Sequence, residues 1–440
     1  MEPFFLGLSV PCSLREPRAI IGAREAEAVD VRRISPEEAL EAIRRGTEEI
    51  FPEEELLEKL KESHRTGRPL RVKLGIDPTA RDLHLGHLIP VLKLKLFQDL
   101  GHQAVLIIGD YTATVGDPTG RNEARPPLSH EEVLENARDY TRLLFQILDP
   151  ERTEVRWNGQ WFGSMSFRDV LWLLSQMTLA RMLEREDFQK RYKGQLPISL
   201  HEMVYPLMQG YDSVMVRADV ELGGIDQKFN IAVGRDLQRA KGMAPQVGVC
   251  NPLLLGTDGR EKMSKSLGNT IPWDGTPEDQ YGKLMSIPDP LIWPYLELLT
   301  EVPMDQVRAW QAAVEEGSLH PKEAKMRLAR EVVKRLHGEE AARAAEAHFE
   351  QVFSRRELPD EMPEVHVAAQ DAPGGEIWPV ALVVQAGLAS SNSEARRLIR
   401  QGAVRLDGET VTDANENVIV RDGMVLQVGR RRFVRVRYQG

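Results

Sequence analysis

The spacing of hydrophobic residues predicts a strand, a helix and a second strand in close succession. Residues 71–76 alternate as in a strand, an apolar helical run extends from about 86 to 100, and residues 104–109 are continuously apolar. A strand, helix and strand within about 40 residues form a βαβ unit of a parallel sheet. Helical patterns around 130–147, 166–184 and 201–212 and an apolar run at 247–255 continue this order. We therefore expect an α/β fold with a doubly wound parallel sheet over residues 34–290.

The start of this domain is marked by a helix N-terminal signal. Ser35 is a suitable N-cap, Pro36 suits the first helical position, and Glu38 stands where a capping box places its acidic partner. Residues 1–33 show no periodicity, so we expect a disordered N-terminal extension there.

The pattern changes after about residue 288. Residues 291–357 are helical throughout and predict an α-helical, tRNA-binding (anticodon-side) domain, a role that follows from the resemblance described below. Prolines and glycines concentrate in 358–376, which predicts a linker. Residues 377–440 predict a small α+β module, with helices at 378–387 and 392–401 and short strands at 404–406 and 433–438.

Composition excludes several classes of protein. With 42% hydrophobic and 28% charged residues, the 440-residue chain has the composition of a globular protein rather than of a disordered or collagen-like one. No apolar run approaches the roughly 18 residues that span a bilayer, and the apolar stretch 3–12 lacks the basic residues of a secretory signal. Cys12 and Cys250 offer neither a disulfide framework nor a zinc site. We expect a cytoplasmic protein without a bound metal or membrane contact.

Charge is distributed unevenly along the chain. The formal net charge is −10, yet residues 378–440 contain ten arginines against six acidic residues. The C-terminal module is therefore the segment that we expect to bind a polyanion.

Two short motifs in the α/β domain suggest nucleotide chemistry. In His84-Leu85-Gly86-His87, two imidazoles lie at the start of the helix that follows the first strand, where free N–H groups favour phosphate. Lys262-Met263-Ser264-Lys265-Ser266 lies between glycines, on a loop that can close over a triphosphate. Either motif alone is weak, because surface histidines and lysine-rich turns are common. The presence of both motifs in one α/β domain argues against ordinary surface residues and favours a nucleotide site.

The two motifs resemble the H-x-G-H and K-M-S-K-S signatures of the class I aminoacyl-tRNA synthetases. The resemblance extends from about residue 35 to the C-terminus and implies a Rossmann-like catalytic domain. It also implies that the chain joins an amino acid to ATP and then to tRNA, that ATP arrives with Mg²⁺, and that the chain is a homodimer.

A third cluster points to the amino acid. Tyr205, Gln209 and Asp212 are spaced i, i+4, i+7, which places a phenol, an amide and a carboxylate on one helical face. Residues 223–227, Gly-Gly-Ile-Asp-Gln, resemble an element of the tyrosine-specific branch of this family. The resemblance therefore implies that tyrosine and tRNA(Tyr) are the substrates.

The resemblance also assigns roles to individual residues. It places Asp117, Tyr205 and Gln209 on the substrate ammonium, Asp212 on the phenol hydroxyl and Gln227 near the carboxylate. His84, His87, Lys262 and Lys265 would neutralise charge in the transition state. Thr112 would line the nucleotide cleft and belong to the tyrosine site. The ATP site would comprise Asp77, Thr79, His84, Gly86, His87, Gly224, Asp226, Lys262, Met263, Ser264, Lys265 and Ser266. Arg121 and Arg125 would meet phosphate or the tRNA acceptor end, or belong to a solvated loop.

Lys73 departs from the family pattern. Some members have a tyrosine four residues before the Asp-Pro-Thr turn, and that tyrosine hydrogen-bonds the substrate phenol. Here the position holds Lys73, for which two interpretations remain. Its ammonium either donates to the phenol oxygen as part of the tyrosine site or points to solvent at a strand edge.

The C-terminal module resembles an S4-like RNA-binding domain through 386–388, 393–399 and 402–408. Its arginines would form a basic face for RNA phosphates. The face is expected to comprise Arg396, Arg397, Arg400 and Arg405, with Arg430–Arg432, Arg435 and Arg437.

Three other functions fit parts of the sequence. A tryptophan-specific enzyme of the same class is disfavoured because an indole offers only a donor to Asp212 and Gln209. A small-molecule nucleotidyltransferase would not need the modules after residue 290. A non-catalytic RNA-binding protein would not need both signatures intact.

Overall fold

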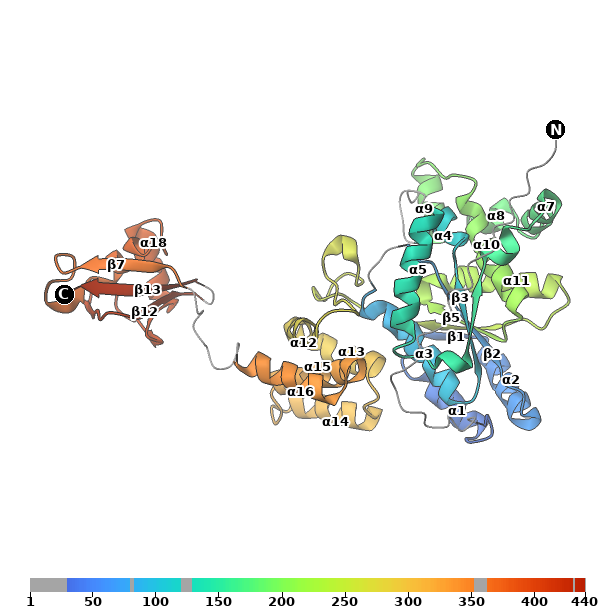
Figure 1. The fold of residues 1–440 in the computed structure, drawn as a ribbon, viewed down its shortest axis with the longest axis horizontal. Helices are drawn as coiled ribbons and strands as arrows, with labels where there is room; N and C mark the ends of the chain where they lie inside the picture. The colour runs from blue at the N-terminus through green and yellow to red at the C-terminus, as the bar shows by residue number, and fades with distance from the viewer. Residues whose placement is uncertain (1–29, 80–82, 120–128, 352–361, 430–431, 440) are drawn as a thin grey trace. The chain divides into compact units, whose positions relative to one another are not determined.

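The strands expected at 71–76 and 104–109 are neighbouring inner strands of a six-stranded sheet (Figure 1). The computed structural model describes residues 30–79, 83–119, 129–351, 362–429 and 432–439. The strand order is β1-β6-β5-β2-β3-β4, and every pair is parallel except β1 with β6. The strands are β1 Glu49–Phe51, β2 Arg71–Ile76, β3 Gln103–Ile108, β4 Thr153–Trp157, β5 Val220–Gly224 and β6 Val247–Asn251. The predicted doubly wound α/β fold is confirmed.

Helices cover both faces of this sheet. In Figure 1, α3 and α5 lie on one side of the strands, and α10 and α11 lie on the other. Connections from β2 lead away through β3 to β4, whereas the connection after β5 leads to β6 in the opposite direction. The crossovers therefore diverge between β2 and β5, and ligands bind at the carboxyl ends of strands at such a switch point. These helices are α3 Leu85–Asp99, α5 His130–Leu144, α10 Tyr205–Val216 and α11 Lys228–Ala240.

Two helices precede the sheet's central strands. Helix α1 has the predicted capping box, in which the Ser35 side chain accepts from the Glu38 backbone and Glu38 returns the contact. The predicted disordered extension is only partly described: residues 1–29 lie outside the described residues. Arg32, in contrast, donates to the His64 carbonyl oxygen at 3.2 Å, so the ordered region begins before Ser35. The helices are α1 Pro36–Arg44 and α2 Glu53–Thr66.

Short helices fill the segment between β3 and β5. They are α4 Thr112–Val115, α6 Gly159–Phe162, α7 Phe167–Ser175, α8 Leu179–Met182 and α9 Glu186–Lys193. The single helical pattern read at 166–184 is thus two helices, because Thr178 caps a new one.

The helical region after residue 276 packs around α15. Helix α15 contacts α12 and α13, and its buried face includes Leu328, Val332 and Val333. The helices are α12 Pro277–Ser286, α13 Ile292–Leu299, α14 Met304–Glu315, α15 Pro321–His337 and α16 Glu339–Phe349. None of the described helices is long and apolar enough to cross a membrane.

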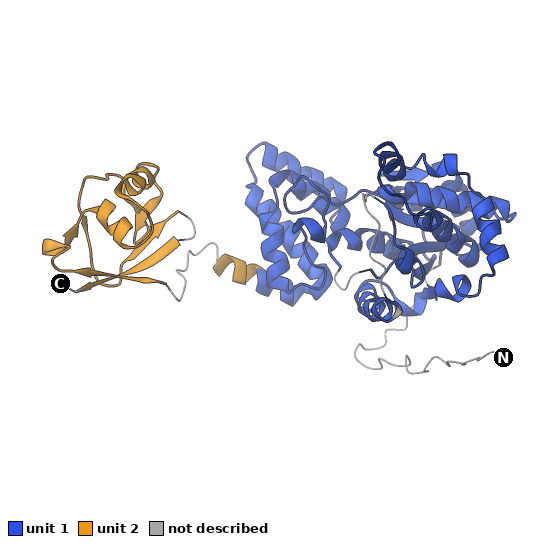
Figure 2. Cartoon of the chain, turned by 90° about the horizontal axis from the view of Figure 1, so that it is seen from above, with its two compact units in different colours: residues 1–345 blue, residues 346–440 orange. Residues whose placement is uncertain are grey.

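The chain divides into two compact units, residues 1–345 and 346–440 (Figure 2). The helical region up to Ala345 belongs to the first unit, and the boundary falls within α16. The second has a five-stranded sheet of order β10-β9-β12-β13-β7 and a small β11-β8 pair. Its elements are β7 Glu364–Ala368, β8 Glu376–Ile377, α17 Pro379–Gln385, α18 Asn392–Arg400, β9 Val404–Leu406, β10 Glu409–Thr410, β11 Val418–Ile419, β12 Val425–Val428 and β13 Arg432–Gln439.

The linker predicted at 358–376 is wrong for residues 362–376, the part that the structure describes. Residues 352–361 lie outside the described residues, but β7 pairs in parallel with β13 and belongs to the sheet of the second unit. Val365 and Val367 are buried while Glu364, His366 and Ala368 are exposed. This alternation is a strand signal that the flanking prolines and glycines obscured.

Candidate active site

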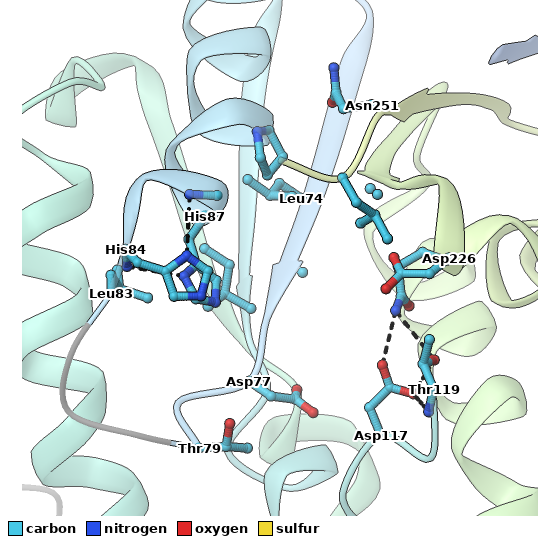
Figure 3. Close-up of a pocket in the computed structure, with 18 of the residues that line it drawn as sticks. Leu74, Asp77, Thr79, Leu83, His84, His87, Asp117, Thr119, Asp226 and Asn251 are labelled. Atoms are coloured by element: carbon cyan, nitrogen blue, oxygen red, sulfur yellow. Dashed lines mark hydrogen bonds between the residues drawn. The ribbon is translucent and has the colours of Figure 1, made fainter. Parts of the chain in front are cut away.

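A cavity of about 730 Å³ opens at the carboxyl ends of β2 and β5, where the crossovers diverge. Both signature motifs contribute to its wall. Figure 3 shows the two imidazoles on one side of the cavity and Asp117, Thr119 and Asp226 on the other. The predicted residues that line it are Asp77, Thr79, His84, Gly86, His87, Thr112, Asp117, Tyr205, Gln209, Asp212, Gly224, Asp226, Gln227, Lys262, Met263, Ser264 and Ser266.

The two histidines form the N-terminus of α3 with their rings in contact. His84 is the N-cap, and its Nδ1 accepts from Gly86 N at 3.2 Å, while His87 Nδ1 accepts from His84 N at 3.2 Å. The ring centroids are 3.9 Å apart. Because each Nδ1 accepts, the proton of each neutral ring is on Nε2. A Cβ on residue 86 would lie 3.0 Å from the His84 ring, so glycine makes room for that ring.

These imidazoles are neutral at pH 7. Burial lowers the pKa of His84 to about 3, with smaller effects from His87 and Lys265. Desolvation and the Lys265 ammonium also lower the pKa of His87 below its usual value. In this structure both rings are therefore uncharged, and the neutralisation of phosphate charge by His84 and His87 stays a prediction. Their Nε2–H groups are suited to donate hydrogen bonds instead, and the positive charge comes from the lysines.

The second motif forms a hairpin after β6. Gly256 N donates to Glu261 O at 2.8 Å, and Met263 N donates to Leu254 O at 2.7 Å. Buried Asn269 closes the hairpin, since its Oδ1 accepts from Ser264 N and its Nδ2 donates to Asp258. The segment that follows is bound to the start of α3: Leu85 N donates to Ile271 O, and Trp273 N donates to Leu83 O. The two signatures, distant in sequence, are thus joined by backbone hydrogen bonds.

The two lysines of the hairpin differ in position. Lys262 lines the cavity, with its Nζ 3.7 Å from Asp226 Oδ2. Burial raises the pKa of Asp226, and Lys262 opposes that shift. Lys265 is exposed and does not line the cavity, although its charge reaches both imidazoles. Movement of the Lys265 side chain or of the hairpin therefore brings this ammonium to a nucleotide.

Helix α10 presents three predicted side chains to the cavity. Tyr205, Gln209 and Asp212 all line it, as the i, i+4, i+7 spacing requires. The Tyr205 hydroxyl donates to Asp77 Oδ2 at 2.8 Å, and burial raises its pKa well above the usual value. Its oxygen therefore stays protonated and retains a lone pair for a cation.

Asp212 is held by two residues that the sequence analysis missed. Its carboxylate accepts from Trp161 Nε1 at 2.9 Å and from Asn158 Nδ2 at 3.3 Å. Asn158 follows β4 and Trp161 is on α6, and neither element was expected. An alternating strand signal at 153–157 was the available clue. Asp212 is 4% exposed, and burial raises its pKa to about 7.

The raised pKa of Asp212 predicts a pH-dependent stability. Between the unfolded pKa of 3.8 and about 7, the folded state holds a proton that the unfolded state has lost. This contribution to stability is complete below pH 3.8 and is lost as the pH rises through about 7. The loss amounts to roughly 3–5 kcal/mol. Urea unfolding of Asp212→Asn at pH 4 and pH 8 is expected to show less decline than the wild type, and equal declines would contradict the prediction.

The Asp77 carboxylate accepts hydrogen bonds from side chains of both α4 and α10. Its Oδ1 accepts from Thr112 Oγ1 at 2.7 Å, and Thr112 also accepts from Asn158. A Cβ on Gly109 would lie 2.0 Å from Asp77 Oδ1, so only glycine allows this approach. Thr79 lies beside Asp77 in Figure 3.

A second group of polar side chains surrounds Asp117. Gln227 Nε2 donates to Asp117 Oδ2 at 2.9 Å, and Thr119 donates to Oδ1. Arg185 Nη2 is 3.4 Å from the same carboxylate. The carboxylate of Asp117, after α4, and the amide oxygen of Gln209, on α10, are both hydrogen-bond acceptors in the cavity wall. Two such acceptors suit an ammonium group.

Lys73 does not belong to the tyrosine site. It is 0% exposed, and its Nζ is 2.9 Å from Glu221 Oε1. Its side chain neither lines the cavity nor points to solvent, so both interpretations are wrong. The side chain is on the buried face of β2, where the partner carboxylate of β5 compensates for its desolvation.

The arginines assigned to RNA differ in their surroundings. Arg397 and Arg400 are exposed on α18, whereas Arg405 is half-buried on β9. Arg396 stacks 5.0 Å from the Trp378 ring centroid and donates to Asn415. Arg437 pairs with Glu364, and Arg432 donates to the Leu388 carbonyl. Arg430 and Arg431, like Arg121 and Arg125, lie outside the described residues.

Known proteins resemble this chain over most of its length. The family described as tRNA synthetases class I (W and Y) matches residues 65–354, and the S4 domain family matches residues 380–422. A tyrosine–tRNA ligase of Moorella thermoacetica is 54% identical over 90% of this chain and 95% of its own length. One of Carboxydothermus hydrogenoformans is 52% identical over 91% and 98%. The crystal structure of a tyrosyl-tRNA synthetase complexed with L-tyrosine from Archaeoglobus fulgidus has a TM-score of 0.57 and 26% identity, covering 71% of this chain and 99% of that one.

The fold, the two signatures at one cavity and the family match define a class I aminoacyl-tRNA synthetase of the tryptophan and tyrosine family, to which the chain belongs. Within that family it is a member of the tyrosine–tRNA ligase group with a C-terminal S4 domain.

Proposed function

We propose that the chain activates tyrosine with ATP to give tyrosyl-adenylate and pyrophosphate, and then transfers the tyrosyl group to the 3′ end of tRNA(Tyr). The observation that carries this proposal is Asp212, a buried carboxylate on the α10 face that also carries Gln209 and Tyr205. A buried acceptor in the wall of an amino-acid site suits a phenol hydroxyl. The relatives named as tyrosine–tRNA ligases support the same substrate.

The mechanism needs no protein nucleophile. The tyrosine carboxylate is already ionised and attacks the α-phosphate of ATP, with pyrophosphate leaving. Catalysis is then positioning and electrostatic stabilisation. Asp117, Tyr205 and Gln209 hold the ammonium, and Gln227 lies near the carboxylate. Asp226 and Gly224 meet the ribose, and the Nε2–H groups of His84 and His87 and the ammoniums of Lys262 and Lys265 stabilise the phosphates. Mg²⁺ enters with ATP as part of the substrate.

ATP–pyrophosphate exchange with each of the twenty amino acids tests this function. Exchange is expected with tyrosine alone. Exchange with tryptophan instead, or with none of the twenty, would overturn the proposal.

We also propose that the second unit binds tRNA through exposed arginines of α18. Arg397→Ala with Arg400→Ala is expected to raise the tRNA KM. It should also reduce the slope of log Kobs against log[salt] by roughly 0.7–0.9 for each tRNA phosphate that the variant no longer neutralises. ATP–pyrophosphate exchange should not change, because every residue that lines the cavity precedes residue 274.

The surroundings of the arginines supply a control. Arg437→Ala removes a charge that already pairs with Glu364 and Asp422, so its effect on tRNA should be smaller. A truncation test should remove residues 352–440 rather than 378–440, because the shorter deletion leaves β7 without its partner β13. Unchanged tRNA KM after this truncation would refute the role of the unit.

A homodimer is the assembly that we propose. Phe167, Leu171 and Leu174 are 75%, 51% and 40% exposed at i, i+4, i+7 on α7, and Leu179 and Leu200 are 62% and 82% exposed. Exposed apolar patches mark interaction sites, and the twofold homodimer is the commonest assembly. Light scattering is expected to give twice 49.7 kDa for the wild type and 49.7 kDa for Leu171→Asp.

Ile419→Asp is the matched control, because Ile419 is 59% exposed in the second unit. It should remain dimeric, and a monomeric wild type would refute the proposal.

We place the enzyme in the cytoplasm. Cys250 fits a structural role there, since burial raises the pKa of its thiol to about 12.

A further inference from the structure

A buried ion pair lies directly behind Gln209. Lys73 on β2 and Glu221 on β5 are 0% and 1% exposed and lie outside the cavity lining. Two apolar side chains of similar size would fill the same space without the cost of desolvating two charges. Packing alone therefore does not explain why charged residues occupy these two positions.

Hydrogen bonds occupy the ammonium group and the carboxylate. Lys73 Nζ donates to Gln209 O at 2.8 Å, to Ser213 Oγ at 2.7 Å and to Glu221 Oε1. Glu221 also accepts from Gln209 Nε2 at 3.1 Å, from Ser213 Oγ at 2.9 Å and from Gln246 Nε2. Three partners satisfy the three N–H groups of Lys73, which leaves none for a substrate.

This network determines the direction of the Gln209 amide. A carboxylate accepts but cannot donate, so the Gln209 group that faces Glu221 is Nε2. On the other side, Gln209 Oε1 accepts from Asn230 Nδ2 at 2.9 Å. Asn230 is oriented in turn, because its Oδ1 accepts from Arg185 Nη1 at 3.0 Å and a guanidinium only donates. A reversed Gln209 would set carbonyl oxygen against carboxylate and one NH₂ against another.

We propose that Glu221, held in place by Lys73, is a positioning residue that keeps the carbonyl oxygen of Gln209 directed at the amino group of tyrosine. Gln209 Oε1 has a second lone pair beyond the one that Asn230 uses, and Gln209 lines the cavity. Without Glu221, Asn230 alone opposes a turn of the amide. A turned amide presents NH₂ to an ammonium group, which replaces an attraction by a repulsion. The inference rests on the proposed function, because it takes tyrosine as the ligand of Gln209.

The test compares two ligands that differ only in the amino group. Equilibrium dissociation constants are measured for tyrosine and for 3-(4-hydroxyphenyl)propanoate, which lacks it. In Lys73→Met with Glu221→Met, the preference for tyrosine is expected to fall by about 10- to 100-fold, the range for a hydrogen bond to a charged group. The affinity for the deaminated analogue should change by less than about threefold.

A rescue variant separates the acceptor from the charge. Lys73→Met with Glu221→Gln keeps a carbonyl that can accept from Gln209 Nε2. Gln246 can turn to accept from the new amide, because its Oε1 has no partner among the described residues. The preference for tyrosine should then stay within about threefold of the wild-type value.

Arg191 and Glu202 supply a matched control pair. Both are 2% exposed, and neither lines the cavity. Arg191→Met with Glu202→Met removes an equally buried pair, so thermal unfolding should show a comparable loss of stability. The ratio of the two dissociation constants should not change.

Several outcomes would overturn the inference. Equal weakening of both ligands in the Met/Met variant would assign the pair to structure alone, and so would failure of that variant to fold while the Met/Gln variant folds. An unchanged ratio, or equal ratios in the Met/Met and Met/Gln variants, would also contradict it. The proposed function is tested separately by tyrosine binding to the wild-type protein, and absence of that binding would refute the function itself.

Discussion

Asp212→Ala is expected to abolish most of the discrimination between tyrosine and phenylalanine. Trp161 Nε1 and Asn158 Nδ2 already donate to Asp212, so phenylalanine binding leaves only this buried carboxylate without the substrate hydroxyl that would donate to it. A site of this kind rejects the ligand without the hydroxyl by about 10⁴–10⁵, a magnitude known for a tyrosyl-tRNA synthetase itself rather than one obtained from this structure. Alanine removes the carboxylate and with it the main penalty on phenylalanine.

The measurement is the ratio of kcat/KM for tyrosine and phenylalanine in ATP–pyrophosphate exchange. A ratio is used because the buried substitution also lowers stability and the amount of active enzyme, and these effects cancel. Trp161→Phe serves as the matched variant, since it removes one donor to Asp212 and keeps the carboxylate. Its ratio should lie between those of the wild type and Asp212→Ala. An Asp212→Ala ratio equal to that of the wild type would refute the assignment of the phenol site.

Lys265→Ala is expected to lower kcat for adenylate formation by about 10²–10³ with little change in the Kd of tyrosine. The ammonium lies outside the cavity lining but on a hairpin beside the imidazoles. We propose that this charge reaches the phosphates when the side chain or the hairpin moves, as charge develops in the transition state. The contacts proposed for tyrosine come from α10, the turn after β5 and the residues after α4 and do not involve the hairpin.

Single-turnover kinetics at saturating tyrosine separates binding from chemistry. Lys193→Ala is the control, because Lys193 is an equally exposed lysine in the last turn of α9 and does not line the cavity. It should retain the wild-type rate. A large loss of tyrosine affinity in Lys265→Ala, with normal chemistry once tyrosine is saturating, would contradict the prediction.

Local patterns were enough to predict the features that depend on neighbours in the sequence. The capping box at Ser35, the βαβ unit and the i, i+4, i+7 face of α10 follow from backbone geometry over a few residues. The two signatures identified the family, because their residues are contiguous. β7 escaped detection because two buried valines in a proline- and glycine-rich segment carry little local signal.

Other features depended on residues that are far apart in sequence. Lys73 meets Glu221 across 148 positions, and Asp212 meets Trp161 across 51. The sequence alone could not show whether Lys73 faced substrate, solvent or a carboxylate, because the side of a strand that is buried depends on what packs against it. Arg396 likewise lies on an arginine-rich helix for which RNA contact stays a prediction, and only the fold shows that it stacks on Trp378.

The charge of the site was likewise decided by tertiary structure. Two histidines three positions apart in the sequence suggest a pair of cations. In the fold, burial lowers the pKa of His84 to about 3, and its ring packs on that of His87. Burial raises the pKa of Asp212 to about 7 by the same desolvation. The sequence by itself thus determined which chemical groups are present and how each helix presents them. The packing of distant segments decided which groups are buried, paired or charged, because desolvation and hydrogen-bond direction exist only in the folded chain.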